Sequence, residues 1–564
     1  MISITGKEWK ETIINKNLIE KISQDYDFSS ILSKLIISRN FDYDEINSIT
    51  NENNISNVFK EQKDFKNAVQ LVLSTINNKE NICILGDYDV DGSTATSLIV
   101  LFLKSLNTPF FFHIPDRVKD GYGASKKLFK HLIKKKPKLV IMVDCGSTSN
   151  EAIDYLNQKN IKSLIIDHHE INKPYPKSNV IINPKKDNGY IKYDYLCATT
   201  LVYFFLDLLS KKIKTEIKLS DYLIFVLLAT VCDVMPIRKL NRSIALYVLK
   251  NFRITESLIF KTLYSLINKK NKLNINDIGF KIGPILNSGG RLGKSNYATE
   301  LLTADSLKII NSRCSELIQL NNKRKIIEKL ILDEINFYEI EKNNKDIIVY
   351  FNPNINEGLI GIICSRLKEF FNKPSIVITN SNNILKGSAR STYNYNIGKA
   401  IKNAIDNKLL ITGGGHNMAG GFTLNLDKLK KFEDFLQKDF LKLRTSKKQK
   451  FNYDFEISSN AFNQDFFNDL NKIGPFGTGN PSPTFLLRDL KIIKAKILDQ
   501  KHISIILKSK TGKLINSICF DSFNHKIGEY LINYKKSLNV VGQFNENFWN
   551  NKISLQLTIR DIFI

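Results

Sequence analysis

Short apolar runs alternate with segments of helical spacing through the first 240 residues. The runs are NICIL, PFFFHI, KLVIMV, KSLII and NVIIN, and helix-like segments such as residues 94–106 and 126–134 separate most of them. Continuous apolar runs that alternate with helices indicate a parallel sheet covered on both faces. We therefore predict an N-terminal extension over residues 1–60 and an α/β domain over residues 61–240.

The pattern changes after residue 240 and indicates three further regions. Apolar side chains recur at helical spacing from residue 296 to about residue 343, with charged residues on the other face. Such a long helix is typical of a connector between lobes, so residues 241–345 are predicted to be a helical region and connector helix. A second α/β domain is expected over residues 346–445. Short alternating strands in residues 446–564 indicate a small β-barrel of the kind that binds single strands.

Composition bounds the class of protein. A chain of 564 residues is too long for one hydrophobic core, which agrees with several domains. Its 82 Lys and Arg residues against 56 Asp and Glu residues give a formal net charge of +26. Such a surface attracts polyanions, of which nucleic acid is the commonest. An AT-rich genome also produces a chain rich in Lys, Asn and Ile, so the charge permits this partner without establishing it.

The cysteines and the apolar runs indicate the compartment. None of the seven cysteines forms a C-x-x-C pair, which argues against a zinc ribbon and a disulfide framework and suits a reducing cytosol. The start, MISITGKEWKET, has no apolar signal region, and the longest apolar run, Tyr222 to Val231, is too short to cross a bilayer. We expect a cytoplasmic protein without a membrane partner.

Acidic residues and histidines stand where the apolar runs of the first domain end. These ends are GDYDVDG (residues 86–92), Asp144, the run Asp167-His168-His169, and Asp233 after LIFVLLATVC. In open α/β sheets, ligands bind beyond the carboxyl ends of the strands. We therefore expect four neighbouring elements to bring carboxylates and imidazoles to one place.

A cluster of this kind needs cations. Like charges in a cleft repel and raise one another's pKa, and divalent ions remove that cost. Oxygen ligands with one or two imidazoles suit Mn²⁺ or Mg²⁺, and two such ions would activate water for in-line attack on phosphorus. A single Asp at a strand end is more often a helix cap or a turn residue. Four ends in series, with two adjacent histidines, favour the metal interpretation.

The ordered motifs GDYDVDG, VDCG, DHH and CDVMP resemble the four motifs of the DHH phosphoesterase superfamily. The first motif, IPDRVKDGYGAS and NSGGRLG are similar to the RecJ branch, the single-strand-specific DNA exonucleases. The segments EGLIGIICSRL, KGSARS and GGGHNMAGGF resemble the DHHA1 domain, and GPFGTGNPSPTF resembles the junction into the RecJ OB-fold. The resemblance implies an α/β protein, with a parallel-sheet DHH domain joined by a long helix to an α/β DHHA1 domain, and a C-terminal OB-fold barrel.

The resemblance also implies which residues act. The expected metal ligands are Asp89, Asp91, Asp144, His168 and Asp233. Asp87 is either a further ligand or a residue that orients the loop. His169 is expected to contact the scissile phosphate or to steady the transition state, and Asp167 to fix a histidine tautomer.

A second set of residues is expected to hold the nucleic acid through phosphate contacts and base stacking. Arg117 is interpreted as a phosphate clamp and Tyr122 as a stacking platform, with an ordinary surface turn as the alternative. The other expected contacts are Asn287, Arg291, Arg366, Ser388, Arg390, Gly414, Gly415 and His416. The sequence departs from the family before the glycine of EGLIGI, where Ile355 and Asn356 replace the usual aromatic residue and histidine.

These features, together with the resemblance, predict a metal-dependent exonuclease that hydrolyses phosphodiester bonds of single-stranded DNA, and the resemblance implies a role in recombination and repair. The resemblance implies 5′→3′ polarity, with single-strand-binding protein and a helicase as partners, and we expect a monomer. The alternative is an enzyme for short oligonucleotides or other small phosphate substrates, which would not need the long connector or the barrel. A non-catalytic scaffold is disfavoured because every expected carboxylate and both histidines are present.

Overall fold

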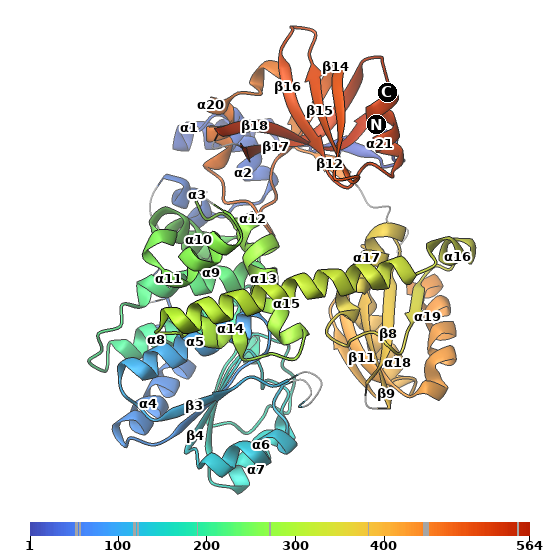
Figure 1. Cartoon of the computed structure of the whole chain (residues 1–564). Helices are drawn as coiled ribbons and strands as arrows, with labels where there is room; N and C mark the ends of the chain where they lie inside the picture. The colour runs from blue at the N-terminus through green and yellow to red at the C-terminus, as the bar shows by residue number, and fades with distance from the viewer. Residues whose placement is uncertain are drawn as a thin grey trace. The chain divides into compact units, whose positions relative to one another are not determined.

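The computed structural model describes residues 1–50, 55, 58–116, 120, 123–188, 190–269, 272–381, 383–443, 451–549 and 552–564. They form two compact units (Figure 1). The smaller unit comprises residues 1–55, 236–247 and 450–564, and the larger comprises residues 56–235 and 248–449. The N-terminal residues therefore belong with the C-terminal barrel, a pairing that the sequence pattern had not indicated.

The larger unit begins with a five-stranded parallel sheet in the order β3-β2-β4-β5-β6. The strands are β2 (Ile82–Leu85), β3 (Phe110–His113), β4 (Leu139–Val143), β5 (Lys162–Ile166) and β6 (Val180–Ile182). Strands β2 and β4 are buried along their whole length, as expected where helices cover both faces. The predicted parallel-sheet domain is confirmed.

Helices surround this sheet. They are α4 (Lys63–Asn77), α5 (Val90–Ser105), α6 (Lys126–Leu132), α7 (Asn150–Gln158), α8 (Ala198–Ser210) and α9 (Leu223–Cys232). The apolar stretch before Asp233 resembles the strand ends in sequence, yet it is the helix α9. This helix is apolar all round because nearly all of it is buried, so it shows no amphipathic period. Helix α5 packs against both α8 and α9.

A helical region and a connector follow. The helices are α10 (Lys239–Asn251), α11 (Leu258–Leu266), α12 (Ile275–Asp277), α13 (Gly283–Arg291), α14 (Tyr297–Leu302), α15 (Leu307–Glu334) and α16 (Phe337–Lys342). The segment expected as one long helix is thus three helices. A new start is set at Ser306, whose side chain caps α15 by accepting a hydrogen bond from the N–H of Ile309. Helix α15 contacts α13 near one end and α17 near the other, and so connects the lobes (Figure 1).

The second lobe of the larger unit has a five-stranded mixed sheet in the order β10-β11-β9-β8-β7. Its elements are β7 (Ile348–Phe351), α17 (Ile360–Phe371), β8 (Ser375–Ser381), β9 (Ile384–Arg390), α18 (Ile397–Asp406), β10 (Thr412–Gly415), β11 (Ala419–Leu424) and α19 (Leu429–Leu443). Helix α17 packs with the end of α15 in one core, and α18 and α19 pack in another. This is the predicted second α/β domain.

The smaller unit contains the predicted barrel. Six strands run in the order β13-β14-β15-β16-β18-β17, and pairing of β14 with β17 closes the circle. They are β13 (Phe455–Glu456), β14 (Thr484–Leu498), β15 (His502–Lys508), β16 (Leu514–Cys519), β17 (Leu538–Trp549) and β18 (Lys552–Phe563). Helices α20 (Gln464–Asn471) and α21 (Lys526–Asn533) accompany them. Phe455 and Phe544 are buried in the barrel core, so their rings serve packing.

The N-terminal residues complete this unit. They form β1 (Trp9–Glu11), α1 (Lys16–Tyr26), α2 (Ser30–Ser38) and α3 (Tyr43–Thr50), and β1 pairs in parallel with β12 (Phe451–Tyr453). Phe28, Leu32 and Leu35 share one hydrophobic core with the barrel residue Phe485. This shared core explains why segments from opposite ends of the chain form one compact unit. Throughout the part of the chain that the structure describes, helices long and apolar enough to cross a membrane are absent.

Candidate metal centre

Three strands of the parallel sheet deliver acidic residues to one edge. Strand β2 pairs with β4, and β4 pairs with β5, so their carboxyl ends are neighbours. The chain continues from these ends into Asp87, Asp144 and Asp167. Asp144 has a φ of 58°, in the left-handed region that is unfavourable for residues other than glycine and that occurs often at functional sites.

The loop after β2 turns directly into helix α5. Asp89 caps this helix, since its Oδ1 accepts a hydrogen bond from the N–H of Gly92 at 3.0 Å. A Cβ atom at Gly92 would lie 2.5 Å from the backbone of Asp87, so this position admits only glycine. The tight loop places Asp87, Asp89 and Asp91 beside the ends of β4 and β5.

One nitrogen atom stands among three carboxylate oxygens. His168 Nε2 lies 3.3 Å from Asp144 Oδ1, 3.5 Å from Asp233 Oδ2 and 3.6 Å from Asp91 Oδ2. Neighbouring ligand atoms around one octahedral ion with bonds of about 2.1 Å stand roughly 3 Å apart. Within the described residues, the buried Asp144 Oδ1 and Asp233 Oδ2 have no hydrogen-bond partner. Buried polar atoms are normally paired, so this donor set fits a divalent cation.

A second group of ligand atoms adjoins the first. Oxygens of Asp87, Asp89 and Asp144 lie within 4.8 Å of one another, and so do ligand atoms of Asp144, His168 and His169. Asp144 therefore belongs to both groups and would be a ligand in either one. Asp87, which the sequence left open as a ligand, lies among the possible ligands.

The raised pKa values of two aspartates reflect burial and the repulsion of neighbouring carboxylates. Burial raises the pKa of Asp233 to about 8, and the nearby Asp91 and Asp89 contribute to this shift. The pKa of Asp144 lies well above its ordinary value for the same reasons, burial first and then Asp91 and Asp89. Bound cations would remove the repulsion that contributes to both shifts.

The two histidines differ in environment. Burial lowers the pKa of His168, so this ring is neutral, as a metal ligand must be. Burial also acts to lower the pKa of His169, but the hydrogen bond and charge of Asp167 outweigh it and raise the pKa to about 9. His169 Nδ1 lies 2.8 Å from Asp167 Oδ1, and the His169 side chain is 41% exposed. Asp167 thus holds the ring as expected and leaves the other nitrogen, Nε2, for a ligand.

Two supports of the site had no signal in the sequence. The backbone N–H groups of Ala198 and Thr199, at the start of α8, donate to the two carboxylate oxygens of Asp91 at 2.8 Å each. Asn183, just after β6, donates from Nδ2 to the carbonyl oxygen of His169 at 2.9 Å. Both contacts join segments that are distant along the chain, which local patterns do not report.

Helix α13 lies against the acidic loop. A Cβ atom at Gly290 would lie 2.2 Å from the carbonyl oxygen of Tyr88, so only glycine permits this approach. Arg291, the next residue, donates from Nη1 to the carbonyl oxygen of Gly358 at 3.3 Å. Asn287 is half-buried on the same helix. The expected contacts on α13 thus lie between the acidic loop and the second lobe.

In the second lobe, two of the expected contacts lie together, and a third is ion-paired with carboxylates. Arg390 donates from Nη1 to Ser388 Oγ at 3.2 Å, and both side chains lie beside Gly361 at the start of α17. Arg366 instead forms ion pairs with Glu328 at 2.9 Å and with Glu369 at 3.3 Å.

The glycine-rich strand is open to solvent. Gly414, Gly415 and His416 are exposed on and just after β10. The pKa of Glu170, the residue after His169, is lowered mainly by its hydrogen bond to Lys185, and the charge of His416 adds to this effect. His416 thus acts electrostatically on a residue beside the metal centre. Arg117 and Tyr122 lie outside the described residues.

Comparison with known proteins agrees with these three lobes. The DHH family N-terminal domain matches residues 81–230, the DHHA1 domain matches residues 344–442, and the RecJ OB domain matches residues 453–561. In this combination of domains the chain resembles the RecJ proteins. The single-stranded-DNA-specific exonuclease RecJ of Bacillus subtilis (strain 168) is 26% identical over 571 residues, which covers 98% of this chain and 70% of that protein.

Solved RecJ structures share the fold. The structure of RecJ in complex with Mn²⁺ from Thermus thermophilus has a TM-score of 0.82 and 21% identity, and the match covers 99% of this chain and 79% of that chain. The complex of RecJ with Mg²⁺ from the same organism has a TM-score of 0.74 and 19% identity, with 98% and 78% covered. The RecJ fold that the motifs implied is confirmed.

Proposed function

We propose that this protein is a metal-dependent exonuclease that hydrolyses phosphodiester bonds of single-stranded DNA. The observation that carries the proposal is the pair of overlapping ligand groups that share Asp144, in which two buried carboxylate oxygens have no hydrogen-bond partner among the described residues. The names of the RecJ relatives support the substrate, and the barrel supports a second grip on the strand.

The residues around the cluster have distinct proposed roles. Asp89, Asp91, Asp144, His168 and Asp233 hold two ions of Mn²⁺ or Mg²⁺, with Asp87 as a sixth ligand. When bound, such ions supply an activated water and neutralise charge at phosphorus. His169, protonated and partly exposed, donates a hydrogen bond to a phosphate oxygen of the substrate. Asp167 keeps the imidazole in the orientation that this donation needs.

The strand is proposed to lie across the lobes of the larger unit. Ser388, Arg390, Gly414, Gly415 and His416 offer hydroxyl, guanidinium, backbone and imidazole donors to phosphates. Asn287 and Arg291 on α13, with Arg117 and Tyr122, are proposed as further contacts. Arg366 is a weaker candidate than the Ser388–Arg390 pair because two carboxylates already hold its guanidinium.

The family resemblance supports further parts of the proposal. Cleavage proceeds from the 5′ end, in DNA recombination and repair in the cytoplasm, by a monomer that cooperates with single-strand-binding protein and a helicase. As functional regions we propose residues 1–60, 61–240, 241–345, 346–445 and 446–564 from the sequence pattern, although residues 1–55 and 236–247 form one compact unit with residues 450–564.

Digestion of end-labelled DNA tests the proposal. Single- and double-stranded DNA, labelled at either end, is incubated with the protein and Mn²⁺ or Mg²⁺, and a length series runs from dinucleotides to long strands. We expect stepwise loss from the 5′ end of long single strands and protection of the duplex. Fastest cleavage of dinucleotides would instead favour the alternative of a phosphodiesterase for small substrates, and no cleavage with either metal would refute both.

A further inference from the structure

Asp91 differs from Asp144 and Asp233 in that both of its carboxylate oxygens accept hydrogen bonds. Its Oδ2 accepts from the N–H of Ala198 at 2.8 Å. Its Oδ1 accepts from the N–H of Thr199 at 2.8 Å and from the hydroxyl of Thr199 at 2.6 Å. All three donors belong to the first turn of α8.

The hydroxyl of Thr199 faces two acceptors of Asp91, Oδ1 at 2.6 Å and the backbone carbonyl oxygen at 2.9 Å. Its single hydrogen is assigned to Oδ1, because this contact is the shorter one and its acceptor is charged. Thr94 Oγ1 lies 2.7 Å from Thr199 Oγ1 and 2.6 Å from the carbonyl oxygen of Val90, so its own hydrogen goes to one of these two oxygens. Thr94 and Thr199 are fully buried and Asp91 is 1% exposed, so bulk water does not compete for these bonds. The three hydrogen bonds from Ala198 and Thr199 hold the carboxylate in one orientation.

Counting lone pairs shows what remains for a cation. An ionised carboxylate has about four acceptor positions, two on each oxygen. Thr199 fills both positions on Oδ1 through its N–H and its hydroxyl, and Ala198 fills one on Oδ2. The remaining position is on Oδ2, the oxygen that lies 3.6 Å from His168 Nε2. Asp91 can therefore offer one oxygen to a metal ion, and it is the oxygen that faces the other ligands.

We propose that Thr199 is a metal-specificity residue, whose hydroxyl restricts Asp91 to one-oxygen coordination and thereby favours Mn²⁺ and Mg²⁺ over Ca²⁺. The chemistry follows from ion size. Ca²⁺ takes six to eight oxygens and often binds both oxygens of a carboxylate, whereas Mg²⁺ demands a compact octahedron. Occupying the second position on Oδ1 removes the two-oxygen mode. This inference rests on the proposed metal-dependent function and adds a determinant of ion choice.

A purely structural role for Thr199 makes a different prediction. A residue that only caps α8 or fills the core would change the affinity for every cation alike. A residue that sets the number of oxygens changes the ratio of affinities, because only the larger ion gains from the second oxygen. The ratio of the Ca²⁺ and Mn²⁺ dissociation constants therefore separates the two roles without any measurement of hydrolysis.

The test is titration calorimetry of the metal-free full-length protein with Mn²⁺ and with Ca²⁺. Thr199→Val keeps the side-chain shape but cannot donate, Thr199→Ser keeps the hydroxyl, and Thr199→Ala removes the hydroxyl with less demand on packing if the valine variant does not fold. Thr200→Val is the matched control, because Thr200 is equally buried but its hydroxyl contacts Cys197 Sγ at 3.2 Å.

Removing a hydrogen bond to a charged group changes an equilibrium by about tenfold or more. We expect the preference for Mn²⁺ over Ca²⁺ to fall by about that factor in Thr199→Val and Thr199→Ala, and to stay within about twofold in Thr199→Ser and Thr200→Val. An unchanged ratio in Thr199→Val and Thr199→Ala, with both ions still bound, would overturn the inference and leave the proposed function standing. Absence of Mn²⁺ binding by the unaltered protein would overturn both.

Discussion

Charged groups are buried in two regions of the molecule, and the two regions differ in the partners that these groups have. In the smaller unit two buried arginines, Arg39 and Arg242, and the half-buried Arg238 have partners: Arg39 pairs with Asp454 at 3.0 Å, and Arg238 Nη2 donates to Glu45 Oε2 at 2.6 Å. Arg242, which is 1% exposed, donates to Ser48 and to two backbone carbonyls, although burial lowers its pKa to about 10. All three guanidinium groups are thus hydrogen-bonded within the protein itself, two of them to carboxylates.

The metal centre of the larger unit has the opposite character. Asp144 and Asp233 are crowded by other carboxylates, and one oxygen of each has no hydrogen-bond partner among the described residues. Paired buried charges specify and hold a structure, whereas unpaired ones of like sign carry a cost that only a bound cation removes. We therefore assign the chemistry to the larger unit. The arginines of the smaller unit and their partners instead hold segments of that unit together.

The largest expected effect is loss of hydrolysis in Asp144→Asn. The variant removes the carboxylate shared by both ligand groups, so turnover on single-stranded DNA should fall by at least about 10³-fold, equivalent to roughly 4 kcal/mol in the barrier. Single-stranded DNA affinity, measured by fluorescence anisotropy, should stay within a few-fold of the parent. Turnover within a few-fold of the parent would contradict the role of Asp144.

The stability of the same variant further tests the comparison of the two regions. Without metal, Asp144→Asn should unfold at a higher urea concentration than the parent, because it deletes one of several buried like charges. Glu45→Gln should do the reverse and lower the free energy of unfolding by about 3 kcal/mol, since it leaves the half-buried Arg238 without its carboxylate. Urea unfolding measures both. A destabilised Asp144→Asn or an unaffected Glu45→Gln would remove the distinction between the regions.

Stability of the metal-free protein should fall as pH rises. Asp233 has a pKa of about 8 when folded against an ordinary value of 3.8, so the folded state keeps a proton that the unfolded state has released between these values. His169, raised from 6.5 to about 9, acts with the same sign. Because Mn²⁺ binding displaces the proton of Asp233, the increase in Tm that Mn²⁺ causes should become larger between about pH 6.5 and about pH 8.5. An increase that shrinks over this range would contradict the account.

The smallest effects concern the DNA grip. Arg390 bonds to Ser388 Oγ and to the carbonyl oxygen of Ala389, whereas carboxylates hold Arg366. Arg390→Met should weaken binding of single-stranded DNA several-fold and reduce the salt dependence of log Kd by about one. Arg366→Met should change both little. Equal effects of the two substitutions would show that the ion pairs of Arg366 break when DNA binds.

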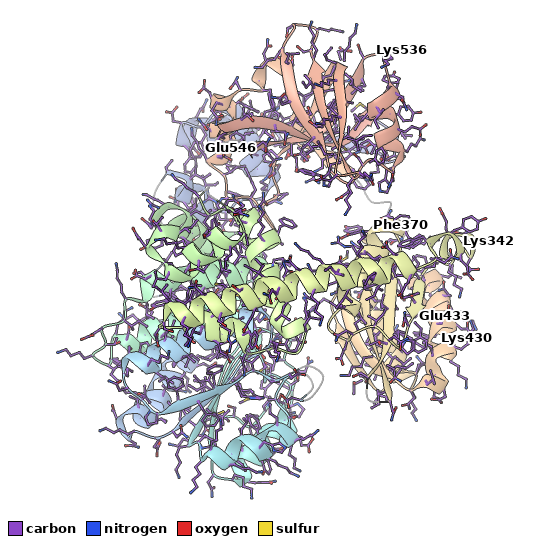
Figure 2. The ribbon with its side chains drawn as sticks, in the orientation of Figure 1. Lys342, Phe370, Lys430, Glu433, Lys536 and Glu546 are labelled. Carbon is purple, nitrogen blue, oxygen red and sulfur yellow. The ribbon has the colours of Figure 1, made fainter. Side chains whose placement is uncertain are left out.

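The salt dependence also tests the net charge of +26. Some lysines are already paired, such as Lys430 with Glu433 on α19 at 3.4 Å (Figure 2). Lys430 also pairs with Asp434 at 3.4 Å. Binding that does not weaken with salt would mean that the lysine content reflects composition and not a functional surface.

The features that could be predicted from the sequence are those that local patterns encode. The strands β2, β4 and β5 are continuous apolar runs, and each is followed by an acidic motif, so sheet and cluster follow from short segments. Helix α9 was missed because its apolar residues show no helical period once the helix is buried on all sides. The family motifs, rather than physical pattern, supplied the roles of individual ligands.

The remaining features depend on contacts between distant segments. Thr199 meets Asp91 across 108 residues, and β1 pairs with β12 near the other end of the chain. Arg366 looks like a phosphate contact in its motif, yet Glu328 on α15 pairs with it across the packing of two helices. Such pairings are set by tertiary packing, for which a single sequence has no local signature.

Titration of the metal-free protein with Mn²⁺, followed by calorimetry in the parent and in Asp144→Asn, tests the central claim most directly. The account predicts two ions per parent chain, and loss of binding in the variant together with loss of hydrolysis. It would be contradicted if Asp144→Asn bound Mn²⁺ like the parent, or if the parent hydrolysed single-stranded DNA unchanged in the presence of a chelator.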